Sequence, residues 1–172
     1  MNARLPKLVF GVMAIYAAFR FFSYYSELPA IVASHFDVHG AANGWQTKQA
    51  FFVVFAGVTI LAAVLVFVLP ALIAIVPRQF VNLPNKEYWL SPERLAASHQ
   101  FLSTWFAWYG CAVYGVIFVA FDYAVKSNLG LATRPDPALL WYGLAAFGAF
   151  TLIWIIRLTL RFARVPAGPG MR

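Results

Sequence analysis

The chain has 172 residues, of which 62% are hydrophobic and only 11% are charged, and its formal net charge is +7. Soluble domains contain about 45–50% apolar and about 25% charged residues, so this composition excludes a soluble globular enzyme, a disordered chain and a coiled coil. The single cysteine excludes a disulfide framework and a cysteine-cluster metal site, and with so few charges the positive excess indicates membrane topology rather than nucleic-acid binding.

Four apolar stretches are long enough to cross the hydrocarbon core of a bilayer as helices. They cover about residues 8–25, 51–76, 102–121 and 138–156. The first is interpreted as an uncleaved span rather than a signal peptide, because its apolar run is long and contains Arg20. We therefore expect an all-α integral membrane protein, a bundle of four transmembrane helices that forms one domain over residues 1–172.

Two features predict how these helices pack. Pro70 should kink the second span, because it removes one backbone donor. Helices in lipid approach one another through small side chains, which recur four residues apart on three of the spans. These residues are Ala14 and Ala18, then Ala107, Cys111 and Gly115, and finally Ala145 and Ala149.

The segment between the first two spans carries turn signals that a plain polar linker would not need. Gly40 permits a tight turn, and Asn43-Gly44 is a strong turn pair. Phe36 and Val38 favour burial. We therefore expect a short strand, a turn and a return, which together form an ordered loop outside the membrane.

Side chains alternate along an extended segment, so His35, Asp37 and His39 fall on one face of this loop. We expect His35 and Asp37 to hydrogen-bond backbone groups and to fix the loop as an ordered cap. The alternative is a weak zinc site, in which both histidines and Asp37 bind the ion with Glu27 as a fourth ligand. The structural interpretation is favoured, so neither a metal nor a cofactor is expected.

The segment between the second and third spans predicts a helix start. Ser91 suits the N-cap, Pro92 the first helical position, and Glu93 the positive end of the helix dipole. Tyr88 and Trp89 precede this start and are expected at the membrane interface. The alternative is a docking surface for a cytoplasmic partner, formed by a motif of Asn82, Pro84, Asn85, Lys86, Tyr88, Trp89, Pro92, Glu93 and Arg94.

Two charged residues lie within or at the edge of the spans. Arg20 lies near the outer end of the first span and Asp122 at the outer end of the third, so both are expected at one depth. A lone charge in the bilayer is costly, so we expect Arg20 and Asp122 to form an intramembrane ion pair. Alternatively, Arg20 reaches a lipid phosphate and Asp122 reaches water, each alone.

Lysines and arginines flank the spans unevenly. The N-terminus, the second loop and the C-terminus share one side, which carries nine of the 13 cationic residues; three lie on the other side and Arg20 lies within a span. Cytoplasmic flanks carry the excess of Lys and Arg, so both termini are expected in the cytoplasm. Arg157, Arg161 and Arg164 share one helix face and are expected to bind anionic lipid headgroups.

The loops also carry a pattern that resembles a known family. The first loop contains Leu28, Pro29, His35, Asp37, Gly40, Gly44, Trp45 and Lys48. With the second-loop motif, this pattern resembles the bacterial membrane family called domain of unknown function 1648, over roughly residues 8–95. The same domain occurs at the N-terminus of SdpI-type proteins, which confer immunity to a secreted toxin and relay its presence to a transcriptional repressor. The resemblance implies a multi-pass protein of the bacterial cytoplasmic (inner) membrane.

Three classes of function are compatible with these observations. The resemblance favours a non-enzymatic protein of the immunity or sensing type, whose outer loop meets a peptide or toxin and whose cytoplasmic side meets a protein partner. The alternative is a small accessory subunit of a larger membrane assembly. A membrane enzyme or transporter is less favoured, because the spans contain no histidine and few charges. No nucleic-acid partner is expected.

Overall fold

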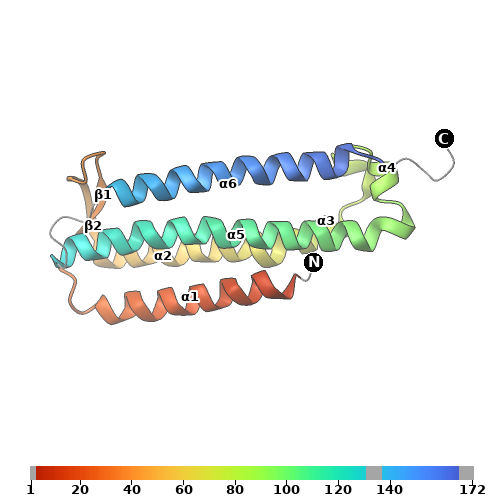
Figure 1. Cartoon of the computed structure of the whole chain (residues 1–172). Helices are drawn as coiled ribbons and strands as arrows, with labels where there is room; N and C mark the ends of the chain where they lie inside the picture. The colour runs from red at the N-terminus through yellow and green to blue at the C-terminus, as the bar shows by residue number, and fades with distance from the viewer. Residues whose placement is uncertain (1–2, 131–136, 167–172) are drawn as a thin grey trace.

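The computed structural model describes residues 3–130 and 137–166 of the chain. Its long helices lie side by side along one axis (Figure 1). We call the end that carries the strands the hairpin end, and the opposite end the α4 end. The elements in chain order are α1 (Arg4–Tyr24), β1 (Ile31–Phe36), β2 (Ala42–Thr47), α2 (Lys48–Ala63), a π-helical segment η1 (Val64–Val68), α3 (Leu69–Ile75), a 3-10 turn η2 (Arg78–Phe80), α4 (Lys86–Trp89), α5 (Pro92–Leu129) and α6 (Pro137–Ala163).

Four helical stretches of the described chain are long and apolar enough to cross a membrane. They are Arg4–Tyr24, Lys48–Leu72, Pro92–Leu129 and Leu140–Ala163. The predicted mostly helical fold, with four such helices and an ordered element between the first two, is therefore confirmed.

The third of these helices extends well beyond the apolar run at 102–121. At 1.5 Å per residue, α5 is about 57 Å long, whereas the hydrocarbon core of a bilayer is about 30 Å thick. Its start is as predicted, with Ser91 at the N-cap and Pro92 at the first helical position, although the Ser91 hydroxyl accepts from Arg94 rather than from a backbone N–H. Gly130, at φ 63°, follows its last residue. The length of α5 lets it contact both ends of the bundle.

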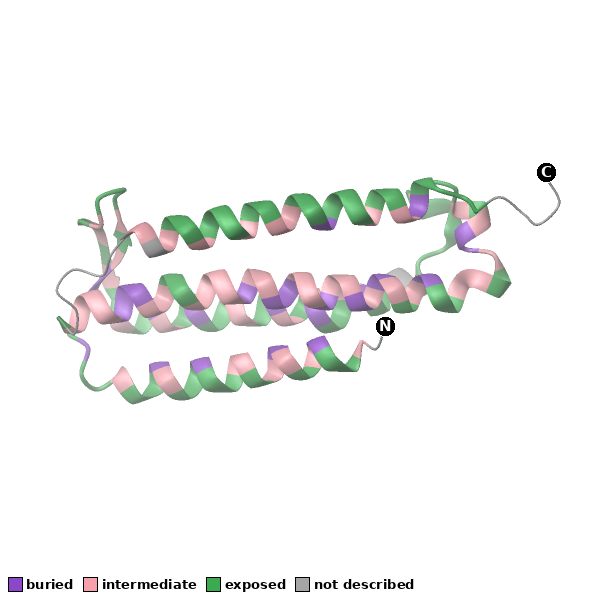
Figure 2. Cartoon of the chain, in the orientation of Figure 1, coloured by how far each residue is buried: buried purple, intermediate pink, exposed green. Residues whose placement is uncertain are grey.

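The main core lies between α1, α2, η1 and α5. Figure 2 shows the buried faces of these helices turned toward one another, while α6 is largely exposed. Ala107 and Cys111 are buried in this core, as the small-residue pattern predicts. The prediction fails for Ala145 and Ala149, which are exposed, because α6 packs on α5 through aromatic side chains such as Trp154. It also fails for Ala18, which is exposed beside the buried Ala17.

The irregularity expected at Pro70 takes the form of a π-helical turn just before it. Proline clashes with the carbonyl four residues earlier in an α-helix, here that of Val66. In η1 the N–H of Leu69 instead donates to the carbonyl of Val64, five residues back. The Val66 side chain is completely buried and lies against Gly110 of α5, at a point where a Cβ on the glycine would collide with it.

Candidate functional site

A two-stranded antiparallel hairpin, β1–β2, covers one end of the bundle. Its turn is built around Asp37, whose Oδ1 accepts the N–H of His39 at 2.8 Å and of Ala41 at 2.9 Å. Gly40 completes the turn at φ 77°, a left-handed conformation that favours glycine. The ordered strand–turn–return is therefore confirmed, and Asp37 pairs with backbone groups as expected.

Of the two turn signals in the sequence, Gly40 lies in the turn and Asn43-Gly44 does not, because the Asp37 turn reverses the chain earlier. Gly44 pairs with His35 across the strands, Ala42 pairs with Phe36, and Asn43 is left as the extra residue of a bulge. A Cβ at Gly44 would lie 3.0 Å from the His35 Cβ and Nδ1. Glycine is needed here for close approach of a side chain rather than for a turn.

The expected backbone bond of His35 is also absent from the described contacts. Its ring is exposed, and its Nδ1 lies 3.0 Å from the Ser34 hydroxyl. The described residues contain no group of three or more His, Cys, Asp or Glu side chains placed to hold a metal, so His35, Asp37, His39 and Glu27 are not brought together. The strand turns at Asp37, which removes the common face that an extended chain would have given them.

Two polar side chains attach the hairpin to the helices. Asn128 of α5 accepts the N–H of Ala33 through Oδ1 and donates to the Ala33 carbonyl through Nδ2, both at 2.8 Å. Lys48 donates through Nζ to the carbonyls of Tyr25 and Leu28, at 3.1 and 3.2 Å, and lies 4.7 Å from the centre of the Tyr25 ring. A cation at the C-terminal end of α1 is favoured by the helix dipole. Asn128 thus fixes the hairpin to α5, and Lys48, the first residue of α2, fixes the segment between α1 and β1.

Acidification is expected to loosen this turn. The backbone N–H of Ala41, and then that of His39, hold the pKa of the Asp37 carboxyl below its usual range. A lowered pKa in the folded state gives a contribution that is present above the unfolded pKa and is lost as the pH falls through the folded pKa. The protection of the amides of residues 37–41 against exchange, relative to their intrinsic exchange rates at each pH, should therefore fall below about pH 4. An Asp37→Asn variant should not show this step, and a step of equal size in that variant would contradict the assignment.

A large apolar groove lies between α5 and α6 below the hairpin, with a volume of about 940 Å³. We call it the α5–α6 groove. Val116 and Tyr123 of α5 line one wall, and Trp141 and Phe147 of α6 line the other. It runs along α5 from Tyr123 to Ala112, which is about 16 Å at 1.5 Å per residue. The groove has the size of a small-molecule site.

The hairpin end of the groove is polar and aromatic. Asp37 and Asn43 of the hairpin line it there, and Asp37 is the one formally charged side chain among the described lining residues. Phe36 packs edge-on against Tyr123, with ring centres 5.1 Å apart. Trp141 also lines this end and is 51% exposed. The arrangement is an apolar channel with one carboxylate and several rings at one end.

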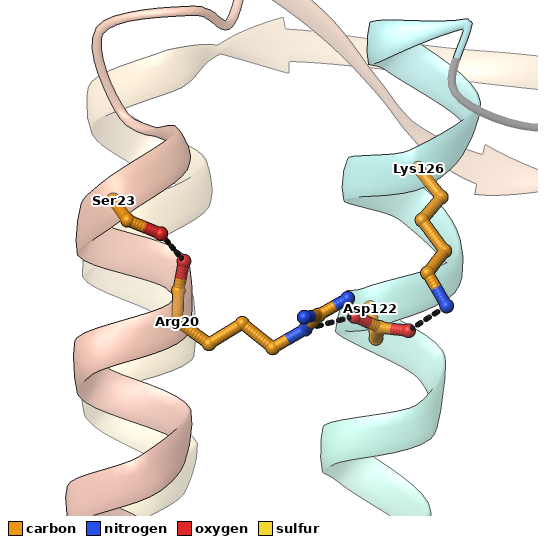
Figure 3. Close-up of polar contacts among 4 residues, drawn as sticks. All are labelled: Arg20, Ser23, Asp122 and Lys126. Carbon is orange, nitrogen blue, oxygen red and sulfur yellow. Dashed lines mark hydrogen bonds and ion pairs between the residues drawn. The ribbon is translucent and has the colours of Figure 1, made fainter.

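Arg20 and Asp122 are brought together across α1 and α5. The Arg20 Nε lies 2.7 Å from Oδ1 of Asp122, and Oδ2 of the same carboxylate lies 2.8 Å from Nζ of Lys126 (Figure 3). Both Arg20 and Asp122 are largely buried, with side chains 24% and 15% exposed. The sequence did not indicate Lys126 as a third member, although its i,i+4 spacing from Asp122 is the ordinary signal for such a pair.

Because Lys126 is the third member, the two single substitutions are expected to differ in their effect on stability. Arg20→Gln leaves Asp122 paired with Lys126, whereas Asp122→Asn leaves two cations without their shared carboxylate. Asp122→Asn should therefore destabilise the protein by about 1–3 kcal/mol and more than Arg20→Gln does. The double variant should cost less than the sum of the two, by about 0.5–3 kcal/mol. The measurement is a double-mutant cycle of unfolding in detergent, and strictly additive losses would contradict the pairing.

At the α4 end, the segment before α5 covers the C-terminus of α6. Asn85 donates through Nδ2 to the carbonyls of Phe162 and Ala163 at 3.0 Å, and Trp89 donates through Nε1 to Phe162 at 2.9 Å. These carbonyls are among the last four of the helix, which have no intrahelical partner. The guanidinium of Arg161 lies 3.8 Å from the centre of the Trp89 ring. We call Asn85, Trp89, Arg161 and Phe162 the α4 cap.

The α4 cap corrects the expectation for Trp89. The residue is 5% exposed and packs edge-on against the fully buried Phe162, so it lies inside the protein rather than at a membrane interface. Its carbonyl also accepts the Ser98 hydroxyl at 2.8 Å. Tyr88 is half-buried and lies 4.0 Å from the Arg94 guanidinium.

The other predicted site residues lie outside these clusters. Leu28 is buried in the core, and the Lys86 Nζ lies 3.4 Å from the Arg78 carbonyl. The remainder are exposed, which leaves them free of a packing role: Pro29, Trp45, Asn82, Pro84, Pro92, Glu93, Arg157 and Arg164.

The four long apolar helices define a multi-pass membrane protein. A family model described as Domain of unknown function (DUF1648) matches residues 9–60, which cover most of α1, the hairpin and the first part of α2. The second-loop motif, from Asn82 to Arg94, lies outside that match. Comparisons with curated proteins and with solved structures gave no match.

Proposed function

We propose that the protein is a non-enzymatic membrane protein of the immunity or sensing type, which binds a peptide or other toxin from outside the cell. The observation that carries this proposal is the α5–α6 groove, because a volume of about 940 Å³ directly below an ordered hairpin suits a ligand. The match to a domain of unknown function over the hairpin is compatible with this role and names no other.

The two ends of the molecule suit different partners. The hairpin end, with the groove mouth, faces outward in this proposal. The protein lies in the inner membrane, and its α4 end faces the cytoplasm. The second-loop motif meets a protein partner there. Arg157 and Arg164 are exposed and meet anionic lipid headgroups at the same end. Arg161 contacts Trp89 in the α4 cap and also meets the lipid headgroups.

This orientation predicts that both termini lie in the cytoplasm. A reporter fused after Arg172, which lies outside the described residues, should be active only if it is a cytoplasmic reporter. A second fusion within the hairpin turn, after Val38, should give the opposite result. Periplasmic activity of the C-terminal fusion would contradict the orientation.

Two glycines of α6 provide a matched test of the groove. Gly143 lines the groove, Gly148 is exposed and is not among the lining residues, and a Cβ added at either meets no atom within 4 Å. Gly143→Leu should project a side chain into the groove and narrow it without a collision at Cβ, and Gly148→Leu provides the same substitution outside it.

The experiment compares cells without the gene with cells that carry the wild type or either variant. All are challenged with a synthetic Lys/Leu amphipathic peptide that depolarises membranes, and survival and the transcriptional response are measured. The wild type and Gly148→Leu should change one of these readouts relative to the deletion, and Gly143→Leu should not. Identical responses in all four strains would contradict the proposal.

The accessory-subunit alternative is favoured by one observation. Ala145 and Ala149 form a small-residue face on α6 that is exposed rather than packed on α5, and such faces permit close approach of another membrane helix. Purification in mild detergent distinguishes the two proposals, since an accessory subunit should elute with a stoichiometric membrane partner that an Ala145→Leu variant loses.

A further inference from the structure

We infer that the α5–α6 groove binds a free single-chain cationic amphiphile, whose ammonium head lies against Asp37 and Trp141 and whose chain follows the groove between α5 and α6. This inference rests on the proposed function and names the chemical class of its ligand. It depends on three properties of the groove, which are its shape, its charge and the rings at its mouth.

The shape fits a chain rather than a compact molecule. The groove extends about 16 Å along α5, from Tyr123 at the hairpin end to Ala112. Between these points its walls are aliphatic or aromatic, with Val116 and Val119 on α5 and Leu144 on α6. An alkyl chain fills such a channel and buries apolar surface on both sides.

The charge lies at one end. Asp37 is the formally charged side chain among the described lining residues, and no ion pair of the described chain involves it. The N–H groups of His39 and Ala41 both donate to Oδ1, which leaves Oδ2 as the carboxylate oxygen for a ligand. The C-terminus of α5 and the N-terminus of α6 both lie at this end, and their opposite dipoles offset each other. The carboxylate therefore sets the preference, which is for a cation.

The aromatic residues at the mouth favour an ammonium in particular. Indole and phenol rings attract cations over their faces, and tryptophan does so most strongly. Trp141 is 51% exposed at the hairpin end of the groove, beside the wall that Phe36 and Tyr123 form. A carboxylate together with exposed rings is the combination that recognises alkylammonium groups.

Bilayer phospholipids suit the groove less well than a free amphiphile. Their headgroup carries a phosphate next to the ammonium, and this anion would be placed near Asp37, where like charges repel. The inferred occupant is therefore a single-chain amine that the membrane itself does not supply.

The test uses full-length protein in phosphatidylcholine nanodiscs and three photoreactive probes. The probes share one diazirine-labelled alkyl chain and carry a trimethylammonium, a hydroxyl or a sulfate head. Covalent labelling is measured against probe concentration, and labelled residues are mapped by mass spectrometry. Wild type and Gly148→Leu should be labelled on α5 and α6 with an ammonium-over-sulfate preference of about tenfold, and Gly143→Leu should lose this labelling for every head.

The Asp37→Asn variant separates the charge from the shape. Its side-chain oxygen can still accept the turn N–H groups, though more weakly than the carboxylate does, so the hairpin still forms while the negative charge is removed. Its ammonium preference should fall to about twofold or less, with hydroxyl-probe labelling unchanged.

The outcomes distinguish the inference from the proposed function. In the first case, Gly143→Leu abolishes the groove labelling, but the labelling shows no head preference or is unaffected by Asp37→Asn. This result overturns the inference of a cationic ligand and leaves the proposed function standing. In the second case, all three probes label Gly143→Leu and Gly148→Leu to the same extent. The groove is then not a binding site, and both the cationic ligand and the proposed function are overturned.

Discussion

Replacing Trp89 with alanine is expected to lower the free energy of unfolding by about 3–5 kcal/mol, the range for deleting a large buried aromatic side chain. Trp89 is 5% exposed, donates to the Phe162 carbonyl at 2.9 Å and lies 3.8 Å below the Arg161 guanidinium. Its loss removes most of the contact between α4 and the C-terminus of α6. Denaturant-induced unfolding in mixed micelles measures the change.

A second variant and a control resolve which contact matters. Trp89→Phe keeps a ring but removes the indole donor, and should cost about 1 kcal/mol because Asn85 still donates to the same carbonyl. Trp45→Ala, at a side chain that is 61% exposed on the hairpin, should cost little. Equal losses in Trp89→Ala and Trp45→Ala would contradict the α4 cap.

Adding one methyl group at Gly110 is expected to destabilise the protein by about 1–3 kcal/mol, the usual cost of overpacking. The new Cβ would collide with Cγ2 of Val66, which is completely buried in η1. Because both residues belong to packed helices, relief needs a shift of one backbone. Thermal unfolding of the purified protein in nanodiscs reports the effect.

The control and the rescue follow from the same geometry. Gly57→Ala places the identical methyl in open space on α2, so it should leave stability unchanged or raise it by up to about 1 kcal/mol, because alanine is the better helix former. Val66→Ala removes the colliding group, so the double variant with Gly110→Ala should be more stable than the sum of the two single losses predicts. Simple additivity would show that Gly110 and Val66 do not limit the approach of α5 to η1.

The features that the sequence predicted correctly depend on one-dimensional rules. Apolar length identified the four long helices, and Ser91-Pro92 identified the start of α5. The meeting of Arg20 with Asp122 was predictable because two costly charges shared one depth in the bilayer. Each of these conclusions needs only composition and position along a helix.

The features that the sequence did not reveal are contacts between ordinary polar residues far apart in the chain. Asn128 binds the Ala33 backbone, and Asn85 binds the end of α6, yet either asparagine could as well have been a surface residue. The sequence carries two turn signals, Gly40 and Asn43-Gly44, and nothing local showed that the Asp37 carboxylate reverses the chain at the first of them. Trp89 was assigned to the interface because nothing local indicates its partner, Phe162.

The groove was also not visible in the sequence, since it exists only because α6 packs on α5 through large side chains and leaves space toward the hairpin. We propose that this space holds a ligand next to Asp37, while the α4 cap holds the other end of α6. Local opening of the backbone can be compared between these two ends by amide exchange.

The most direct measurement is hydrogen–deuterium exchange of the full-length protein in nanodiscs, with and without the trimethylammonium probe. With the probe bound, exchange is expected to slow at residues 37–44 of the hairpin and 138–147 of α6, while residues 85–94 at the α4 end stay unchanged. If the bound probe leaves exchange unaltered at the hairpin and at the start of α6, or alters it only at the α4 end, the groove does not hold the ligand next to Asp37.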